Sequence, residues 1–419
     1  MKTIFLFLLL FSALKAGAQK ITLEQCIDSA LVNYPLSRQQ EIYDQILQTE
    51  LKRLSNTNLP QVNLSAKATL QNQVISFPAN MPAVITFPEL SKDQYRATLE
   101  ISQSIYKGGV TPAQKELSRA SNAVDSAGTE VELNGLKRTV ISIYYQSLLS
   151  KEFLSVSKTY RKTLAAKLGE MEAQIKEGAL LPSAADVVKA EMLTVEQRIT
   201  QLEMNIASLK LQMEKITGMH IGSLDDYVLP APRVSYSAQQ QRPEYKFLEL
   251  SEKKLDALSS VYSSRTRPVV FAFSSLGVGR PGFDYLSNDF APLAMVGLGL
   301  NWNLWNWGDT KKQKSILELK KSLIENRKKS FVTDLNIKLI NLQSEIESEK
   351  KMLEKAEEIA RLRKSVSQTT EKQLKDGVVT ASRYIDELQK YEKARLEVQI
   401  HKVKLSIAQT NYLYALGKL

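Results

Sequence analysis

The sequence predicts a mixed α/β membrane protein built from two tandem copies of one β-β-α unit. Three observations support this. Residues 99–114 recur at 298–313, and the same offset of 199 places Gly178 on Gly377, which indicates a duplication of about half the chain. Short stretches with period-two alternation precede these anchors, as in half-buried strands. Long stretches poor in glycine and proline follow them, as in long helices.

The N-terminus predicts export. Lys2 precedes an apolar run at 4–14, and small residues at 16–18 provide a cleavage site, so we expect residues 1–18 to be a signal peptide. The alternative, an N-terminal anchor, is disfavoured because the run is short for a bilayer span. Cys26 is the only cysteine, so it has no partner for an intrachain disulfide.

The charge gives no indication of nucleic acid as a partner. The formal net charge is +11, or +9 without Lys2 and Lys15, and 24% of the residues are charged. Basic residues alternate with acidic ones along the expected helices and do not form a patch. We therefore interpret the charge as solvated helix faces.

Four strands are expected, at 61–71 and 94–106 in the first copy and at 268–279 and 293–305 in the second. Upstream the offset becomes 208, so the first copy carries nine extra residues in the loop between its strands. Strands of about ten residues match a tilted membrane crossing. Only the third strand alternates poorly. In the second and fourth strands the apolar positions are Tyr95, Ala97, Leu99, Ile101, Ile105, and Val296, Leu298, Leu300, Trp302, Leu304.

The three tryptophans, Trp302, Trp305 and Trp307, gather where the last strand ends, and Tyr106 occupies the matching place in the first copy. Aromatic side chains with one polar end collect at membrane interfaces, which predicts one girdle of a barrel. Core packing beneath the strand–helix joint is the alternative.

Long helices are expected at 110–176, 183–217, 310–375 and 381–416, with shorter ones at 36–58 and 244–263. Two apolar stripes step by four and three, the pattern of coiled-coil packing, and Glu349 interrupts the second. Since these helices are one-sided and four strands cannot close a barrel, we expect association. The stripes are Val188, Met192, Val195, Ile199, Leu202, Ile206, Leu209, Met213, Ile216, and Leu335, Leu339, Leu342, Ile346, Leu353, Ala356, Ala360.

In this arrangement the chain resembles the TolC-type outer-membrane factors, the outer membrane efflux protein family, over essentially its whole mature length. The resemblance rests on the duplication and on the order and spacing of three short motifs: Tyr106-Lys107-Gly108-Gly109, Trp305-Asn306-Trp307-Gly308 and Arg242-Pro243-Glu244-Tyr245. It divides the chain into a first repeat at 19–218, a linker at 219–241 and a second repeat at 242–419.

The resemblance implies a homotrimer in the outer membrane, with a 12-stranded β-barrel of four strands per chain continued by a long periplasmic α-helical coiled-coil barrel. Its implied function is the exit duct of a tripartite efflux or type I secretion system, which accepts substrates from a periplasmic adaptor and an inner-membrane transporter of the RND or ABC type. No cofactor is implied, and the transported substrate is not readable from the sequence.

The two hairpin turns are the expected adaptor contacts. Left-handed glycines are expected to end the first helix of each pair, and Ser183 and Ser382 to cap the second. The alternative is that the turns have no partner. The expected contact residues are Gly178, Ala179, Leu180, Ser183, Gly377, Val378, Val379 and Ser382.

The family's entrance constriction carries acidic residues six and nine positions after the second tip glycine. These positions are Arg383 and Asp386 here, so a cation replaces one carboxylate and an acidic ring is in doubt. Their contact is expected either between neighbouring hairpins or as an i,i+3 pair on one helix.

Two other classes of protein fit the sequence less well. An enzyme is disfavoured because the only histidines, His220 and His401, lie near no cysteine or acidic cluster that forms a metal site, and no phosphate loop is present. A periplasmic coiled-coil adaptor, or a structural protein without a barrel, has one helical hairpin within a compact β domain, whereas two equivalent hairpins each follow two strands here.

Overall fold

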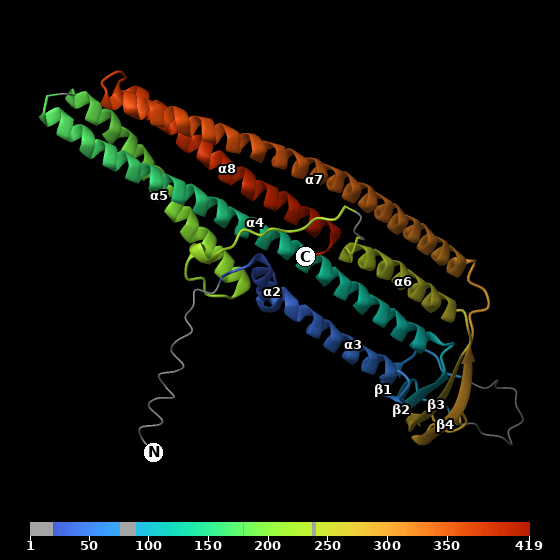
Figure 1. Ribbon diagram of the computed structural model, residues 1–419. Helices are drawn as coiled ribbons and strands as arrows, with labels where there is room; N and C mark the ends of the chain where they lie inside the picture. The colour runs from blue at the N-terminus through green and yellow to red at the C-terminus, as the bar shows by residue number, and fades with distance from the viewer. Residues whose placement is uncertain (1–19, 76–88, 179, 237–239) are drawn as a thin grey trace, which may run out of the picture. The chain divides into compact units, whose positions relative to one another are not determined.

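The computed structural model describes residues 20–75, 89–178, 180–236 and 240–419. The expected signal peptide at 1–18 lies outside the described residues. No described helix combines the length and the apolar composition needed to cross a membrane. In chain order the described elements are α2 (Leu23–Asn33), the 3-10 helix η1 (Pro35–Arg38), α3 (Gln39–Asn56), β1 (Gln61–Leu70), β2 (Asp93–Tyr106), α4 (Val110–Lys176), α5 (Pro182–Thr217), the 3-10 helix η2 (Leu224–Asp226), α6 (Pro243–Ser264), β3 (Val269–Arg280), β4 (Ala291–Asn301), α7 (Asp309–Lys375) and α8 (Ala381–Leu416) (Figure 1).

The lengths of the helices repeat with the sequence. Helices α4 and α7 each have 67 residues, and α5 and α8 each have 36. Gly218 and Gly417 are 199 residues apart, and each directly follows a helix. Their φ angles are positive, at 70° and 77°. A left-handed glycine provides the helix-ending conformation without the cost that a Cβ brings. The two copies therefore use the same stop signal.

The chain forms two compact units, and each contains residues of both copies. Unit 1 holds the described residues up to Gln39 together with those of 128–245 and 329–419. Unit 2 holds the described residues of 40–127 and 246–328, including the whole sheet. The helices α4 and α7 contribute residues to both units.

The sheet of unit 2 is antiparallel with strand order β1-β2-β3-β4 (Figure 1). Because directly paired residues point to the same side, the register defines two faces, named here the apolar face and the polar face. The apolar face exposes large side chains such as Leu64 (80%), Val296 (82%) and Leu298 (73%). The polar face of β1 and β2 carries Asn63, Ser65, Lys67, Thr69, Gln94, Arg96, Thr98, Glu100 and Ser102.

Two details of the sheet differ from the expected alternation. Strand β4 ends at Asn301, short of the expected 305, because Asn301 pairs with Val269 and the preceding Pro268 has no N–H for a further ladder bond. A register shift between Ser104 and Tyr106 pairs Tyr106 with Val270. Tyr106 therefore lies on the apolar face, where Ile105 was expected.

The poor alternation of β3 has a packing explanation. A Cβ built on Gly299 would lie 2.3 Å from the Phe271 ring, and one built on Gly297 would lie 2.6 Å from the Phe273 ring. The rings thus cover the backbone of β4, and the glycines leave room for them. Apolar residues therefore occur on both faces of β3, because Phe271 and Phe273 on the polar face pack against β4.

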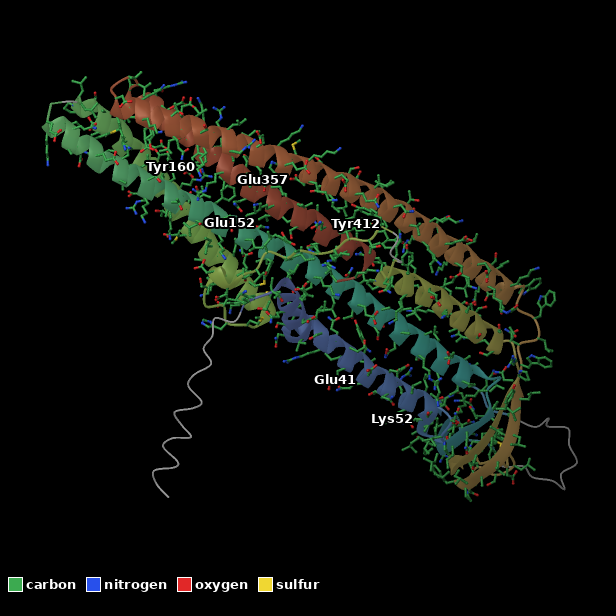
Figure 2. The ribbon with its side chains drawn as sticks, in the orientation of Figure 1. Glu41, Lys52, Glu152, Tyr160, Glu357 and Tyr412 are labelled. Carbon is green, nitrogen blue, oxygen red and sulfur yellow. The ribbon has the colours of Figure 1, made fainter. Side chains whose placement is uncertain are left out.

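Residues of both coiled-coil stripes contribute to the buried clusters of unit 1. Val188, Val195 and Met213 of α5 are buried, and so are Leu339 and Ile346 of α7. At the gap in the second stripe, His401 Nδ1 lies 2.6 Å from Glu349 Oε2, so the carboxylate has a partner on α8. Further along α8, the Tyr412 hydroxyl (Figure 2) accepts a hydrogen bond from Gln343 at 3.2 Å.

The helix α2 was not expected from the sequence. Thr22 and Gln25 form a capping box at its start, and Leu23, Cys26 and Ile27 enter a core cluster with Tyr144 of α4. Burial raises the pKa of the Cys26 thiol to about 12, so little reactive thiolate forms at neutral pH. Cys26 therefore acts as a core residue.

Candidate functional site

The first candidate site comprises the two hairpin turns. Gly178 and Gly377 have φ angles of 75° and 72°, the left-handed conformation expected from the sequence. At the second turn, the Val378 N–H donates to the Gln373 carbonyl at 2.8 Å, and the Gly377 N–H to that of Leu374 at 3.1 Å. These bonds satisfy carbonyls at the end of α7. Ala179 lies outside the described residues.

The expected serine caps are wrong. The N-cap of α5 is Leu181, which makes no side-chain bond, and Pro182 opens the helix. Proline needs no amide partner and has a helical φ, so it starts the helix one residue before Ser183. In α8 the cap is Thr380, whose hydroxyl accepts from the Arg383 N–H at 3.3 Å. Ser382 therefore lies inside the helix.

The turns present exposed apolar side chains. Leu181 is 75% exposed and Val378 is 69% exposed, whereas Leu180 and Val379 pack against a buried cluster. The exposed Leu181 was missed from the sequence, although its place directly before Pro182 was a usable signal because residues before proline are extended. Ser183 and Ser382 are exposed and polar.

The expected entrance pair lies on one helix. Arg383 and Asp386 of α8 are 3.6 Å apart, which is the i,i+3 alternative. Lys390 donates to Asp386 at 2.7 Å, and this hydrogen bond lowers the pKa of the Asp386 carboxyl. Glu387, which the sequence did not single out, is buried and lies 3.2 Å from Arg383 and 3.5 Å from Arg363 of α7. These contacts join α7 to α8 within the second hairpin.

A buried lysine joins the two hairpins to each other. Lys167 of α4, with a side chain only 5% exposed, donates to Glu170 at 2.7 Å and to Glu371 of α7 at 3.0 Å. Its Nζ lies 5.4 Å from the ring centroid of Tyr384 on α8. Burial lowers the pKa of Lys167, but the two hydrogen bonds outweigh it and the pKa is raised. The lysine is therefore a stable cation between helices of both copies.

Next to Lys167 lies a cavity of about 410 Å³, lined by residues that include Tyr391 and Glu392. Burial raises the pKa of the Glu392 carboxyl, and Arg395 at 3.3 Å opposes this only in part. About two turns before Lys167 on α4, the Tyr160 hydroxyl (Figure 2) donates to Glu191 of α5 at 3.2 Å. No cluster of potential metal ligands occurs within the described ranges.

The aromatic residues at the helical end of the sheet are exposed. Trp302 continues the apolar face and donates its indole N–H to the Thr266 carbonyl at 3.0 Å. Trp305 and Trp307 make an edge-to-face contact at 5.9 Å, and Tyr106 is 46% exposed. Exposure on this face contradicts core packing as the explanation for Trp302.

A second aromatic group at the opposite end of the apolar face was missed. Arg280 lies 5.5 Å from the ring centroids of both Tyr95 and Phe290, and it forms an ion pair with Asp93. Phe290 belongs to the loop between β3 and β4, where period-two alternation gives no signal. The apolar face thus has aromatic residues at both ends.

Comparisons with known proteins establish the fold. The chain is similar to the outer membrane protein VceC of Vibrio cholerae, with 12% identity, a TM-score of 0.69 and coverage of 94% of this chain and 96% of VceC. It is also similar to the CmeC outer membrane channel of Campylobacter jejuni, with 14% identity, a TM-score of 0.68 and coverage of 94% of this chain and 85% of CmeC. The MtrE outer membrane channel of Neisseria gonorrhoeae, in its open state, is similar with 15% identity, a TM-score of 0.66 and coverage of 94% of this chain and 88% of MtrE. No family model matches the sequence, and no curated protein matches it. These likenesses confirm the TolC-type fold.

Proposed function

We propose that the chain is the outer-membrane exit duct of a tripartite efflux or type I secretion system. The observation that carries the proposal is the exposed apolar face of the sheet with aromatic residues at both ends. In water, a contiguous apolar surface of this kind is unfavourable, and a bilayer is the environment that it fits.

The dimensions support this environment. Tyr95 and Tyr106 lie on the apolar face at the two ends of β2. They are separated by roughly 35 Å along the strand at about 3.3 Å per residue. A strand tilt of about 40° brings this to roughly 27 Å, close to the apolar band of about 25 Å in outer-membrane barrels. The two aromatic groups would then lie at the two interfaces.

Open strand edges support association of several chains. Within the described residues, β1 and β4 each pair on one side only. Unpaired strand edges are not tolerated in lipid, so the four strands of one subunit must pair with the strands of neighbouring subunits. The TolC-type fold implies a homotrimer, with 12 strands in one barrel.

Unit 2 also carries two unpartnered helix stripes that match each other. Ile42 and Ile46 of α3 are 53% and 56% exposed, and Leu319 and Leu323 of α7 are 65% and 63% exposed. Ile46 lies ten residues before the end of α3, and Leu319 ten residues after the start of α7. At about 1.5 Å per residue, each side chain stands about 15 Å along its helix from the end that connects to the sheet. We infer that α3 of one subunit packs against α7 of the neighbouring subunit.

The helical hairpins are proposed to extend into the periplasm. Their tips, with Leu181 and Val378 exposed, are the proposed contacts for a periplasmic adaptor, which links the duct to an inner-membrane transporter of the RND or ABC type. Apolar side chains at a tip suit packing against another helical hairpin. This assignment includes the expected tip residues from Gly178 to Ser183 and from Gly377 to Ser382.

Two measurements test the proposed function. The protein should be extracted from outer-membrane fractions only by detergent, and the purified protein should produce discrete conductance steps in planar bilayers. A protein released by salt or by lysis alone, with no conductance, would instead support the alternative of a periplasmic adaptor or structural protein.

A further inference from the structure

The polar face of the sheet carries two cations side by side. The register places Lys67 of β1 directly opposite Arg96 of β2. Directly opposed residues of an antiparallel pair have Cβ atoms about 5 Å apart, and like charges at this spacing are destabilising. Both side chains are exposed, and none of the described carboxylates forms an ion pair with either.

The surroundings do not neutralise the pair. Arg96 faces Gly279 on its other side, so no side chain of β3 covers it. The acidic residue of this face, Glu100, lies four positions along β2, or roughly 13 Å away at about 3.3 Å per residue. Asp93 lies on the apolar face and is already paired with Arg280. Because no nearby carboxylate offsets the repulsion between Lys67 and Arg96, the pair does not stabilise the fold, and its presence points to a role in function.

We propose that Lys67 and Arg96 form a ring that attracts anions inside the outer mouth of the duct, so that anionic solutes pass in preference to cations. This inference rests on the proposed function, because the polar face lines the lumen only when the apolar face meets lipid. Both residues lie three positions from the ends of their strands that are remote from the helices. Three copies supply six cations at one level.

The physical basis is electrostatic focusing. Rings of lysine and arginine select anions in other pores, and clefts of one charge raise the local concentration of the opposite ion. The ligand class is therefore a soluble anion, such as a carboxylate or phosphate ester. The effect must weaken with salt, since the Debye length falls from about 30 Å at 0.01 M to about 10 Å at 0.1 M.

The test measures reversal potentials of the mature trimer in planar bilayers under an asymmetric, dilute KCl gradient. The double variant Lys67→Gln/Arg96→Gln should lower the ratio of chloride to potassium permeability by about twofold or more. Glu100→Gln should raise this ratio, and Lys67→Arg, which keeps the charge, should leave it unchanged. Single glutamine variants serve the same purpose where the double variant does not assemble.

A second measurement is local to the mouth. Tripolyphosphate added on the side of the strand loops should reduce the current of the unmodified protein and of Lys67→Arg, and the double variant should lose this block. Conducting channels with the same permeability ratio and the same block in the double variant would overturn the ring. Absence of any channel in the unmodified protein would instead contradict the proposed function itself.

Discussion

Lys167 of α4 and Glu371 of α7, 204 residues apart in the sequence, are joined by a hydrogen bond of 3.0 Å. Glu170 and the ring of Tyr384 complete the surroundings of the ammonium group. The contact connects a helix of the first hairpin to both helices of the second. It differs from the network of Arg383 and Asp386, which lies within the second hairpin.

Lys167→Ala should therefore destabilise the helical part by about 1 to 3 kcal/mol, because two charged hydrogen bonds are lost from a buried lysine. It should also raise the single-channel conductance, since the polar tie between the hairpins is removed. Chemical denaturation followed by circular dichroism measures the first effect, and planar bilayers measure the second. Lys162→Ala, an exposed lysine on the same helix, is the control. Equal stability and equal conductance of the two variants would show that Lys167 does not hold the two hairpins together.

Glu392 predicts a pH dependence of stability. Its folded-state pKa is raised above 4.5 by burial, so its ionisation costs stability as the pH rises from below 4.5 through the folded-state pKa. Glu392→Gln should raise the free energy of unfolding by about 1 kcal/mol at pH 8, and this gain should vanish at pH 4. Exposed Glu354→Gln should show no such gain. A gain that is the same at both pH values would contradict burial as the cause.

The two faces of the sheet should respond differently to a new charge. Leu99→Arg, on the apolar face, should cost about 2 to 4 kcal/mol if the site is near the midplane of the bilayer. Ser102→Arg, on the polar face of the same strand, should assemble normally. Folding yield into liposomes, measured by the heat-dependent shift in gel mobility, compares them. Similar yields for both variants would mean that the apolar face does not meet lipid.

The stripe on α7 provides a test of association. Leu319→Glu should dissociate the trimer in mild detergent, because it places a carboxylate against the apolar stripe of α3 without a partner. Ser322→Glu changes the same helix beside the stripe and should leave the trimer intact. Size-exclusion chromatography with light scattering distinguishes them. An undiminished yield of trimer for Leu319→Glu would show that the subunits do not pack together through this part of α7.

The fold was largely predictable because it depends on repeated local signals. Period-two alternation located β2, and left-handed glycines marked the turns at Gly178 and Gly377. The N-caps were wrong because Pro182 and Thr380 start their helices earlier than the serines do. Lys167 was missed because a lysine is usually solvated, and only the approach of a distant helix buries this one.

The site was less predictable than the fold. The contact between Arg383 and Asp386 could not be assigned to one helix or two, since the spacing permits either. The aromatic group of Tyr95 and Phe290 depends on a loop that positions Phe290 beside Arg280. The adaptor contacts at the tips stay a prediction, because they depend on a second protein.

The central claim, an assembled membrane duct, is tested most directly by native mass spectrometry of the mature protein released from detergent micelles. The account predicts a single species with the mass of three chains, because open edges on β1 and β4 and the stripes on α3 and α7 all require neighbours. A stable species with the mass of one chain would contradict it.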